Sequence, residues 1–118
     1  ININYSNYNY NIFSKMYKII KTTSDDKIIL NKIANQILED KLSPCVSISK
    51  KNKSYYRWNN EIQSSKEYSL NIKTSRDLVE KCYTIIKKLH NYETPEIIEI
   101  NFKIINNKYK EWFEKNIK

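Results

Sequence analysis

A chain of 118 residues suits a single domain with one hydrophobic core. Its hydrophobic content of 40% and aromatic content of 13% exclude an intrinsically disordered chain, and no apolar run approaches the roughly 20 residues of a membrane-spanning helix. The net charge of +8 favours loose attraction to polyanions, but only Arg57 and Arg76 offer guanidinium groups for reading bases, so specific nucleic-acid binding is not expected.

The two cysteines, Cys45 and Cys82, do not form a CxxC pair and support neither a disulfide framework nor a structural zinc site. We therefore expect free thiols in a reducing compartment. The start of the chain has neither a basic nor an apolar segment of the kind found in signal peptides. Residues 1–14 instead alternate Asn with Ile or Tyr, which predicts an extended arm ahead of a domain over residues 15–118.

A strand and a helix are predicted to begin this domain. Residues 16–23 are apolar and β-branched, as in a buried strand. Ser24 then offers an N-cap oxygen, and the helix runs to about Lys41. Asp25 and Asp26 favour the positive end of that helix. Its apolar face comprises Ile29, Leu30, Ile33, Ala34, Ile37 and Leu38.

Extended segments follow the helix. Residues 45–49 and 54–58 are apolar or aromatic, and the polar stretch 50–53 interrupts them. The sequence NNE at 59–61 predicts a turn, because Asn tolerates a left-handed backbone better than most residues. Residues 67–74 alternate apolar and polar side chains, which is typical of a strand.

A second helix, a last strand and a closing helix complete the predicted domain. Thr74 or Ser75 is expected to cap the second helix, which ends near His90. Pro95 opens the last strand. The second helix has the buried stripe Leu78, Cys82, Ile85 and Leu89; the strand carries Ile98, Ile100 and Phe102 on one face; the closing helix contains Tyr109, Trp112 and Phe113.

This order of elements predicts an α+β fold of the ferredoxin-like, split βαβ type. Such a fold has an antiparallel four-stranded sheet with two helices on one face, and here it carries an added C-terminal helix. The closing helix and the arm are too short to cover the second face of the sheet. We therefore expect the chain to form an oligomer.

Five short segments resemble, in order and spacing, the signature segments of the CutA family of divalent-cation tolerance proteins. They are SPCVSI, SYYRWNNEI, LNIKT, LHNYETPEIIEI and YKEWF, and the resemblance covers about residues 16 to 117. It implies a tight homotrimer in the cytoplasm, without enzymatic activity and linked to copper and other divalent metals. It also implies a likeness to PII signalling proteins, which bind small effectors in clefts between subunits.

The resemblance implies a copper site at three positions, and this sequence departs from the pattern at two of them. The matching positions hold Thr22, Leu89 and His90, and only His90 is a strong ligand. We therefore expect at most weak binding of copper or another divalent metal, through His90 or Cys45. A helix C-cap is the favoured interpretation of His90, and a small apolar filler in a strand is the favoured interpretation of Cys45.

A second candidate site is a cleft between subunits. The resemblance places Tyr92 and Glu93 before the last strand and Lys73 at the end of a central strand, and these residues are expected to converge with Trp58 nearby. Glu93 is the natural partner of a buried Lys73, because an unpaired buried ammonium loses its charge.

Two other functions remain open. A structural or signalling trimer could bind a small effector or a partner protein. RNA binding is weaker, because residues 67–74 contain one aromatic and no glycine, whereas RNA-recognition strands need both.

Overall fold

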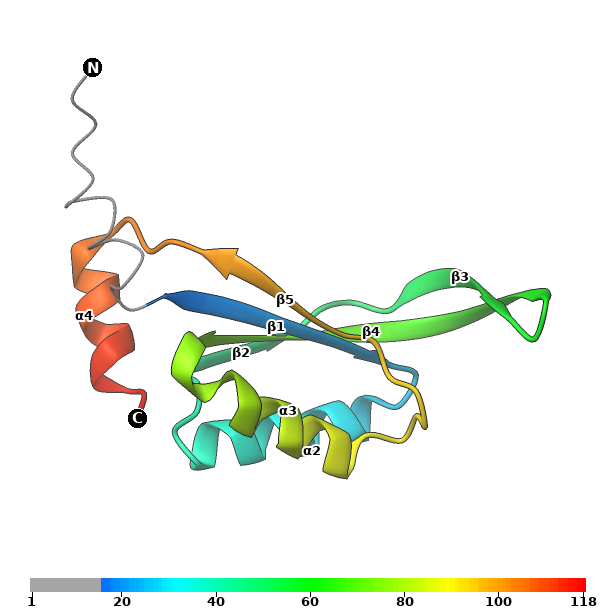
Figure 1. Ribbon diagram of the computed structural model, residues 1–118, viewed down its shortest axis with the longest axis horizontal. Helices are drawn as coiled ribbons and strands as arrows, with labels where there is room; N and C mark the ends of the chain where they lie inside the picture. Colours follow the sequence, from blue (N-terminus) through cyan, green and yellow to red (C-terminus); the bar gives the residue numbers. More distant parts are fainter. Residues whose placement is uncertain (1–15) are drawn as a thin grey trace, which may run out of the picture.

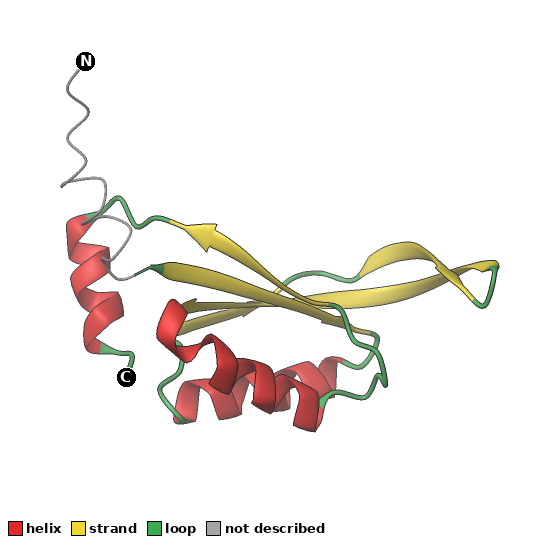
Figure 2. Ribbon diagram, viewed as in Figure 1, coloured by secondary structure: helices red, strands yellow, loops and turns green. Residues whose placement is uncertain are grey.

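The structure of this chain, a computed structural model, describes residues 16–118, so the predicted arm over 1–14 lies outside the described residues. It is a mixed α/β fold in which helices α2 and α3 lie on one face of an antiparallel sheet, and α4 packs at one end (Figures 1 and 2). The elements are β1 (Tyr17–Ser24), α2 (Lys27–Glu39), β2 (Cys45–Ile48), β3 (Asn52–Trp58), β4 (Glu61–Ser75), the 3-10 turn η1 (Arg76–Leu78), α3 (Val79–Leu89), β5 (Ile97–Phe102) and α4 (Asn107–Lys115).

The sheet has the order β2-β4-β1-β5, and β3 continues the pairing with β4 beyond β2. The polar interruption predicted at 50–53 is therefore real but shorter, since β2 ends at Ile48 and β3 begins at Asn52. The predicted strand 67–74 is only the second half of the 15-residue β4. The prediction missed residues 61–66, because this part of β4 projects past the helices and its side chains do not alternate between buried and exposed (Figure 1).

The hairpin between β3 and β4 turns at Asn59 and Asn60, as predicted. Both have left-handed backbone, with φ of 51° and 63°, and Trp58 pairs directly with Glu61. Two consecutive left-handed residues match the twist of the flanking strands. This geometry lets a chain without glycine build a tight hairpin.

The cap of α2 is Asp26 rather than the predicted Ser24. The Asp26 carboxylate accepts hydrogen bonds from the backbone N–H groups of Ile28 and Ile29, at 2.9 and 3.3 Å. Ser24 stays in β1, where its hydroxyl is fully buried. The helix ends at Glu39, and Lys41 leaves it with a left-handed φ of 57°.

The predicted cap of the second helix is also wrong. The Thr74 hydroxyl donates instead to the carbonyl of Leu42, at 2.6 Å, and this bond links β4 to the segment that follows α2. Ser75 forms no capping hydrogen bond. The chain enters α3 through η1, and this entry brings Ile86 rather than Ile85 to the fully buried position.

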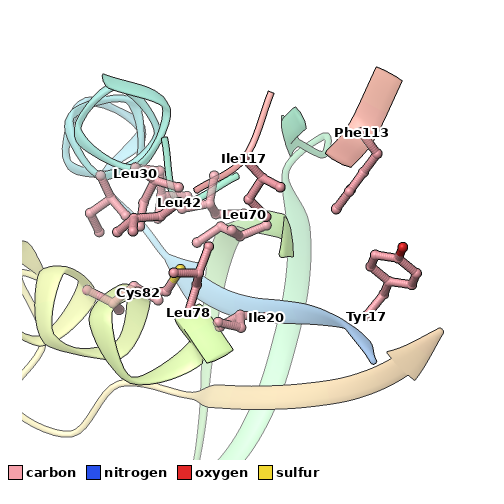
Figure 3. Packing of buried hydrophobic residues seen from close by; sticks show 13 residues of the cluster. Tyr17, Ile20, Leu30, Leu42, Leu70, Leu78, Cys82, Phe113 and Ile117 are labelled. Atoms are coloured by element: carbon pink, nitrogen blue, oxygen red, sulfur yellow. The ribbon is translucent and has the colours of Figure 1, made fainter. Parts of the chain in front are cut away.

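The main core lies between the sheet and the two helices. Figure 3 shows Leu30, Leu42, Leu70, Leu78 and Cys82 gathered there, with Tyr17 and Phe113 to one side. Its residues are Tyr17, Ile20, Leu30, Ile33, Ile37, Leu42, Leu70, Ile72, Leu78, Cys82, Ile86, Phe113 and Ile117.

Among residues 16–118, the second face of the sheet is covered at the end where α4 packs and is open elsewhere. There Tyr17, Phe102 and Phe113 stack with ring centroids 5.3 to 6.2 Å apart. Further along β5, Ile98 and Ile100 on the same strand face stay 43% and 49% exposed. The expectation of an uncovered apolar surface is thus met within the described residues, and the oligomer that would cover it stays a prediction.

Candidate ligand groove

A groove of about 950 Å³ lies at the end of the sheet away from α4, between the β3/β4 hairpin and the loop that joins α3 to β5. We call it the hairpin groove. Its lining combines aromatic, amide, hydroxyl and carboxylate side chains: Lys21, Thr23, Asn52, Ser54, Tyr55, Tyr56, Trp58, Gln63, Glu67, Ser69, Asn91, Tyr92, Glu93, Thr94, Pro95 and Glu96. Within residues 16–118 the groove is open to solvent, and Trp58 in its lining is 52% exposed.

Strand alternation sets one wall of the groove. Tyr56 and Trp58 are two residues apart on β3, so both side chains point to one face of the hairpin. Their register partners on β4 are Gln63 and Glu61, and further along the same face Asn52 pairs with Glu67. The hairpin thus presents its aromatic rings and the Glu67 carboxylate on the same side.

His90 anchors the opposite wall. Its Nε2 lies 2.9 Å from the Thr23 carbonyl, and its Nδ1 accepts the Tyr92 backbone N–H at 3.0 Å. The second bond assigns the proton to Nε2, which donates to Thr23. Burial lowers the pKa of His90 below its ordinary value, although the Thr23 carbonyl, Asp25 and Glu67 each oppose that shift. His90 is therefore a neutral imidazole that joins β1 to the loop between α3 and β5 through these two hydrogen bonds.

The prediction that His90 caps the second helix is confirmed: His90 is the C-cap residue of α3, with its N–H bonded to the Ile86 carbonyl at 2.9 Å. Its ring, however, bonds β1 rather than the last carbonyls of the helix. Both ring nitrogens are occupied, so neither is free to bind a metal without breaking a contact.

The loop is fixed further by side-chain amide bonds. Ser24 donates to the Asn91 side-chain oxygen at 2.5 Å, and the Asn91 amide nitrogen donates to the Asp25 carboxylate at 2.9 Å. These bonds join residues 66 and 67 positions apart in sequence. They hold Tyr92 over the start of α2.

Tyr92 links the two walls. Its hydroxyl accepts the Asp25 backbone N–H at 2.9 Å and donates to Glu67 Oε2 at 2.7 Å. Burial raises the pKa of Tyr92, and the bond to Glu67 raises it further. Glu67 is only 9% exposed. Sequence patterns missed Glu67 because it opens the predicted strand like an ordinary surface residue, and only the tertiary contact with Tyr92 reveals it.

Three of the four residues predicted to share a cleft do line the hairpin groove: Trp58, Tyr92 and Glu93. Lys73 does not. It pairs with Ile19 and Cys45, and its ammonium lies 5.9 Å from the centre of the Tyr109 ring, at the α4 end of the sheet. Within one chain Lys73 and Glu93 are thus not partners, and their pairing across a subunit boundary stays a prediction.

The candidate metal ligands are not brought together either. Cys45 is half-buried and pairs with Lys73, which in turn pairs with Ile19 of β1. His90 contacts Thr23, which lies four residues further along β1 than Ile19, so the two candidate ligands lie apart. Residues 16–118 contain no cluster of three or more His, Cys, Asp or Glu side chains able to hold a metal ion. Thr22 is fully buried. These side chains do not fit a tight copper centre.

Comparison with known proteins identifies the fold. Residues 18–116, nearly all of the described chain, match the family described as CutA1 divalent ion tolerance protein. The chain belongs to this family. It is 32% identical over 94 residues to the divalent-cation tolerance protein CutA of Pyrococcus horikoshii, covering 80% of this chain and 91% of that protein.

Solved CutA1 structures have the same fold. The Thermus thermophilus protein superposes with a TM-score of 0.82 at 29% identity, covering 87% of this chain and 100% of that one. Oryza sativa CutA1 gives 0.82 at 30% identity, with coverages of 87% and 94%. The chloroplastic CutA of Arabidopsis thaliana is 32% identical over 96 residues, covering 81% of this chain but only 53%, about half, of the plant protein.

The expectation of a cytoplasmic protein, taken from the family resemblance, is wrong as a family rule. The Arabidopsis relative is named chloroplastic, and an Archaeoglobus fulgidus structure is described as a periplasmic divalent cation tolerance protein. Family membership therefore assigns no compartment. Within residues 16–118, no helix has the length and hydrophobicity needed to cross a membrane.

Proposed function

We propose that this CutA1-family chain contributes to divalent-cation tolerance as a non-enzymatic homotrimer, with the hairpin groove as its ligand cleft. The match over residues 18–116 carries the proposal, because it includes every strand and both walls of the groove. The strand order β2-β4-β1-β5, with α2 and α3 on one face, supports the ferredoxin-like assignment. The exposed Ile98 and Ile100 support an oligomer, since burying them in a subunit contact would be favourable, and the family resemblance makes it a trimer.

Copper enters this proposal only as a weak ligand or as the ion that the protein helps the cell to withstand. His90 would have to give up its bond to Thr23 or Tyr92 to bind a metal. Cys45 is too isolated from it to form a chelate. The groove, rather than a resident metal, is therefore the part of the fold to which we assign the function.

The test is metal tolerance in a bacterial strain that lacks its own CutA protein. Expression of this chain should restore growth in copper or zinc, and Trp58→Ala in the groove should reduce the restored growth. Trp112→Ala is the matched control, because the two tryptophans are similarly exposed, at 52% and 44%, and Trp112 lies on α4. Failure of the unaltered chain to restore growth, or equal effects of the two variants, would contradict the proposal.

A further inference from the structure

The β3/β4 hairpin separates its charged side chains by sign between its two faces. Lys53, Arg57 and Lys66 share one face, because Lys53 and Arg57 are an even number of residues apart on β3 and Lys66 is the register partner of Lys53 on β4. Glu61 and Glu67 lie on the other face, which borders the hairpin groove. All five charged residues of the hairpin follow this division. We call the face with the three cations the basic face.

The basic face lies on the side of the sheet that carries α2 and α3. Lys66 and Tyr68 alternate in step with Leu70, which is fully buried beneath the helices. The hairpin projects past both helices (Figure 1), and its three cations are exposed. Ile98 and Ile100, to which we assign the subunit contact, lie on the opposite side of the sheet. A contact that buries these isoleucines therefore does not need the basic face.

Two further lysines join the basic face where the hairpin leaves the body of the fold. The ammonium groups of Lys27 and Lys51 lie 5.7 and 5.5 Å from the centre of the Tyr68 ring. Lys27 is the first residue of α2, and Lys51 lies between β2 and β3. The carboxylates next to Lys27 in sequence, Asp25 and Asp26, accept hydrogen bonds from other groups. Five cations from three parts of the chain thus line this side of the hairpin.

Two of these cations occupy unfavourable positions. Lys53 and Lys66 lie directly opposite each other across the two strands, and like charges in that position destabilise a sheet. Lys27 lies at the N-terminus of a helix, where the helix dipole disfavours a positive charge. A bound polyanion would relieve both penalties, because its phosphate groups would neutralise the ammonium groups.

The aromatic side chains among the cations indicate the class of polyanion. The Tyr55 ring is 68% exposed, and the Lys53 ammonium lies 5.2 Å from its centre. Proteins bind single-stranded nucleic acids by combining cations along the backbone with aromatic rings on which unpaired bases stack. An anionic lipid surface would instead favour a cluster of apolar side chains beside the cations, and Ile62 is the single aliphatic residue on this face of the hairpin.

We propose that the basic face binds single-stranded nucleic acid without sequence preference, with Lys53, Arg57 and Lys66 on phosphates and a base stacked on Tyr55. This activity is separate from the proposed ligand role of the hairpin groove and does not depend on it. It also differs from RNA recognition on strand 67–74, because the basic face lies mainly on the projecting hairpin. The dissociation constant should lie at about 10⁻⁴–10⁻⁶ M, the range of non-specific binding.

The probe is a fluorescein-labelled oligothymidylate of about 12 nucleotides, titrated with the full chain and followed by fluorescence anisotropy. We expect binding that weakens with added salt, and weaker binding of the same strand annealed to oligoadenylate, because a duplex hides the faces of its bases. Absence of binding at low salt, or equally tight binding of the duplex, would overturn the proposal.

A triple variant tests the cations of the basic face. Lys53→Gln, Arg57→Gln and Lys66→Gln together should weaken binding at least about tenfold, and the slope of log affinity against log salt should fall by about 2, because each phosphate contact to a single strand contributes about 0.7.

The matched control for net charge replaces Lys108, Lys110 and Lys115 with Gln. These lysines are exposed on α4, at the other end of the molecule (Figure 1). The control variant removes the same charge and should weaken binding less than about threefold. Equal losses in the two triple variants would show that net charge alone attracts the strand and would overturn the proposal.

A tyrosine variant tests the stacked base. Tyr55→Leu should weaken binding at least about fivefold, the lower end of what base–aromatic stacking contributes. Tyr83→Leu on α3 is the matched control, because Tyr83 is also exposed, at 41%, and also has a lysine ammonium near its ring, that of Lys87 at 5.7 Å. Equal effects of the two variants would refute stacking on Tyr55.

Vesicles that contain phosphatidylserine test the other polyanionic partner. The basic-face triple variant should change vesicle binding no more than the α4 variant does. A loss of vesicle binding confined to the basic-face variant, with oligothymidylate binding unchanged, would assign this face to a membrane surface and overturn the proposal.

Discussion

The bond between Tyr92 and Glu67 provides the sharpest test of how the groove is held together. Tyr92→Phe removes the hydroxyl that donates to the buried Glu67 and accepts from the Asp25 backbone. The ring itself remains, with its contact to His90 at a centroid distance of 5.0 Å. The change therefore deletes two hydrogen bonds while leaving the shape of the loop nearly intact.

The expected loss follows from the two bonds. A hydrogen bond to a charged group contributes about 1.5–3 kcal/mol to stability. Glu67 borders an open groove, so water can replace part of the lost donation, and we take the lower end of that range. The Asp25 N–H lies at an exposed position and costs little. We expect Tyr92→Phe to lower the free energy of unfolding by about 1–2 kcal/mol.

The assay is urea unfolding at a fixed protein concentration, because an oligomer would make the midpoint depend on concentration. Tyr83→Phe is the matched control, since Tyr83 is 41% exposed on α3 and forms none of the side-chain hydrogen bonds found in residues 16–118. Glu67→Gln and the double variant complete a mutant cycle, whose coupling energy should be at least about 0.5 kcal/mol. A loss equal to that of Tyr83→Phe, or a coupling near zero, would refute the account of the groove.

Three further predictions follow from other features. Burial lowers the pKa of His90, so the unfolded chain binds more protons than the folded chain. The stability that His90 contributes should be complete above pH 6.5 and should fall as the pH drops through 6.5 towards the pKa of His90 in the folded protein. A pH profile unchanged in His90→Gln would argue against this. Because both His90 nitrogens are engaged, calorimetry should detect no nanomolar copper site, and a tight site abolished by His90→Ala would prove the prediction wrong. The exposed Ile98 and Ile100 predict an oligomer, and the family resemblance implies that it is a trimer, which sedimentation equilibrium would detect. Glu93→Ala should weaken the trimer if Glu93 meets Lys73 of a neighbour. A monomer at micromolar concentration would exclude both statements.

Local patterns predicted the elements because each depends on residues close in sequence. Asn59 and Asn60 determine the hairpin turn through their tolerance of left-handed backbone, and the alternation of Leu70 and Ile72 places both on the buried face of β4. The errors fell at ends of elements. Asp26 replaced Ser24 as the cap of α2 because Ser24 still belongs to β1, which the local pattern could not show.

The candidate site was predicted in part. Trp58, Tyr92 and Glu93 were recognised from the family resemblance, and they do lie together. Within one chain Lys73 lies apart from these residues, because register places it beside Ile19 at the end of the sheet away from the loop, and its pairing with Glu93 across a subunit boundary stays a prediction. The ring contact of His90 was missed because its partner, the Thr23 carbonyl, is a backbone atom 67 residues away.

The amino-acid sequence by itself determined the order of strands and helices and the family, since these follow from hydrophobic periodicity, turn chemistry and matching segments. Only the tertiary structure decided which polar groups meet. Glu67 and Tyr92 are 25 residues apart, and Ser24 and Asn91 are 67 apart, so no local pattern encodes either contact. The physical reason is that the pairing of β4 with β1 decides which distant backbone segments lie close together, and buried polar side chains can bond only to the partners which that packing provides.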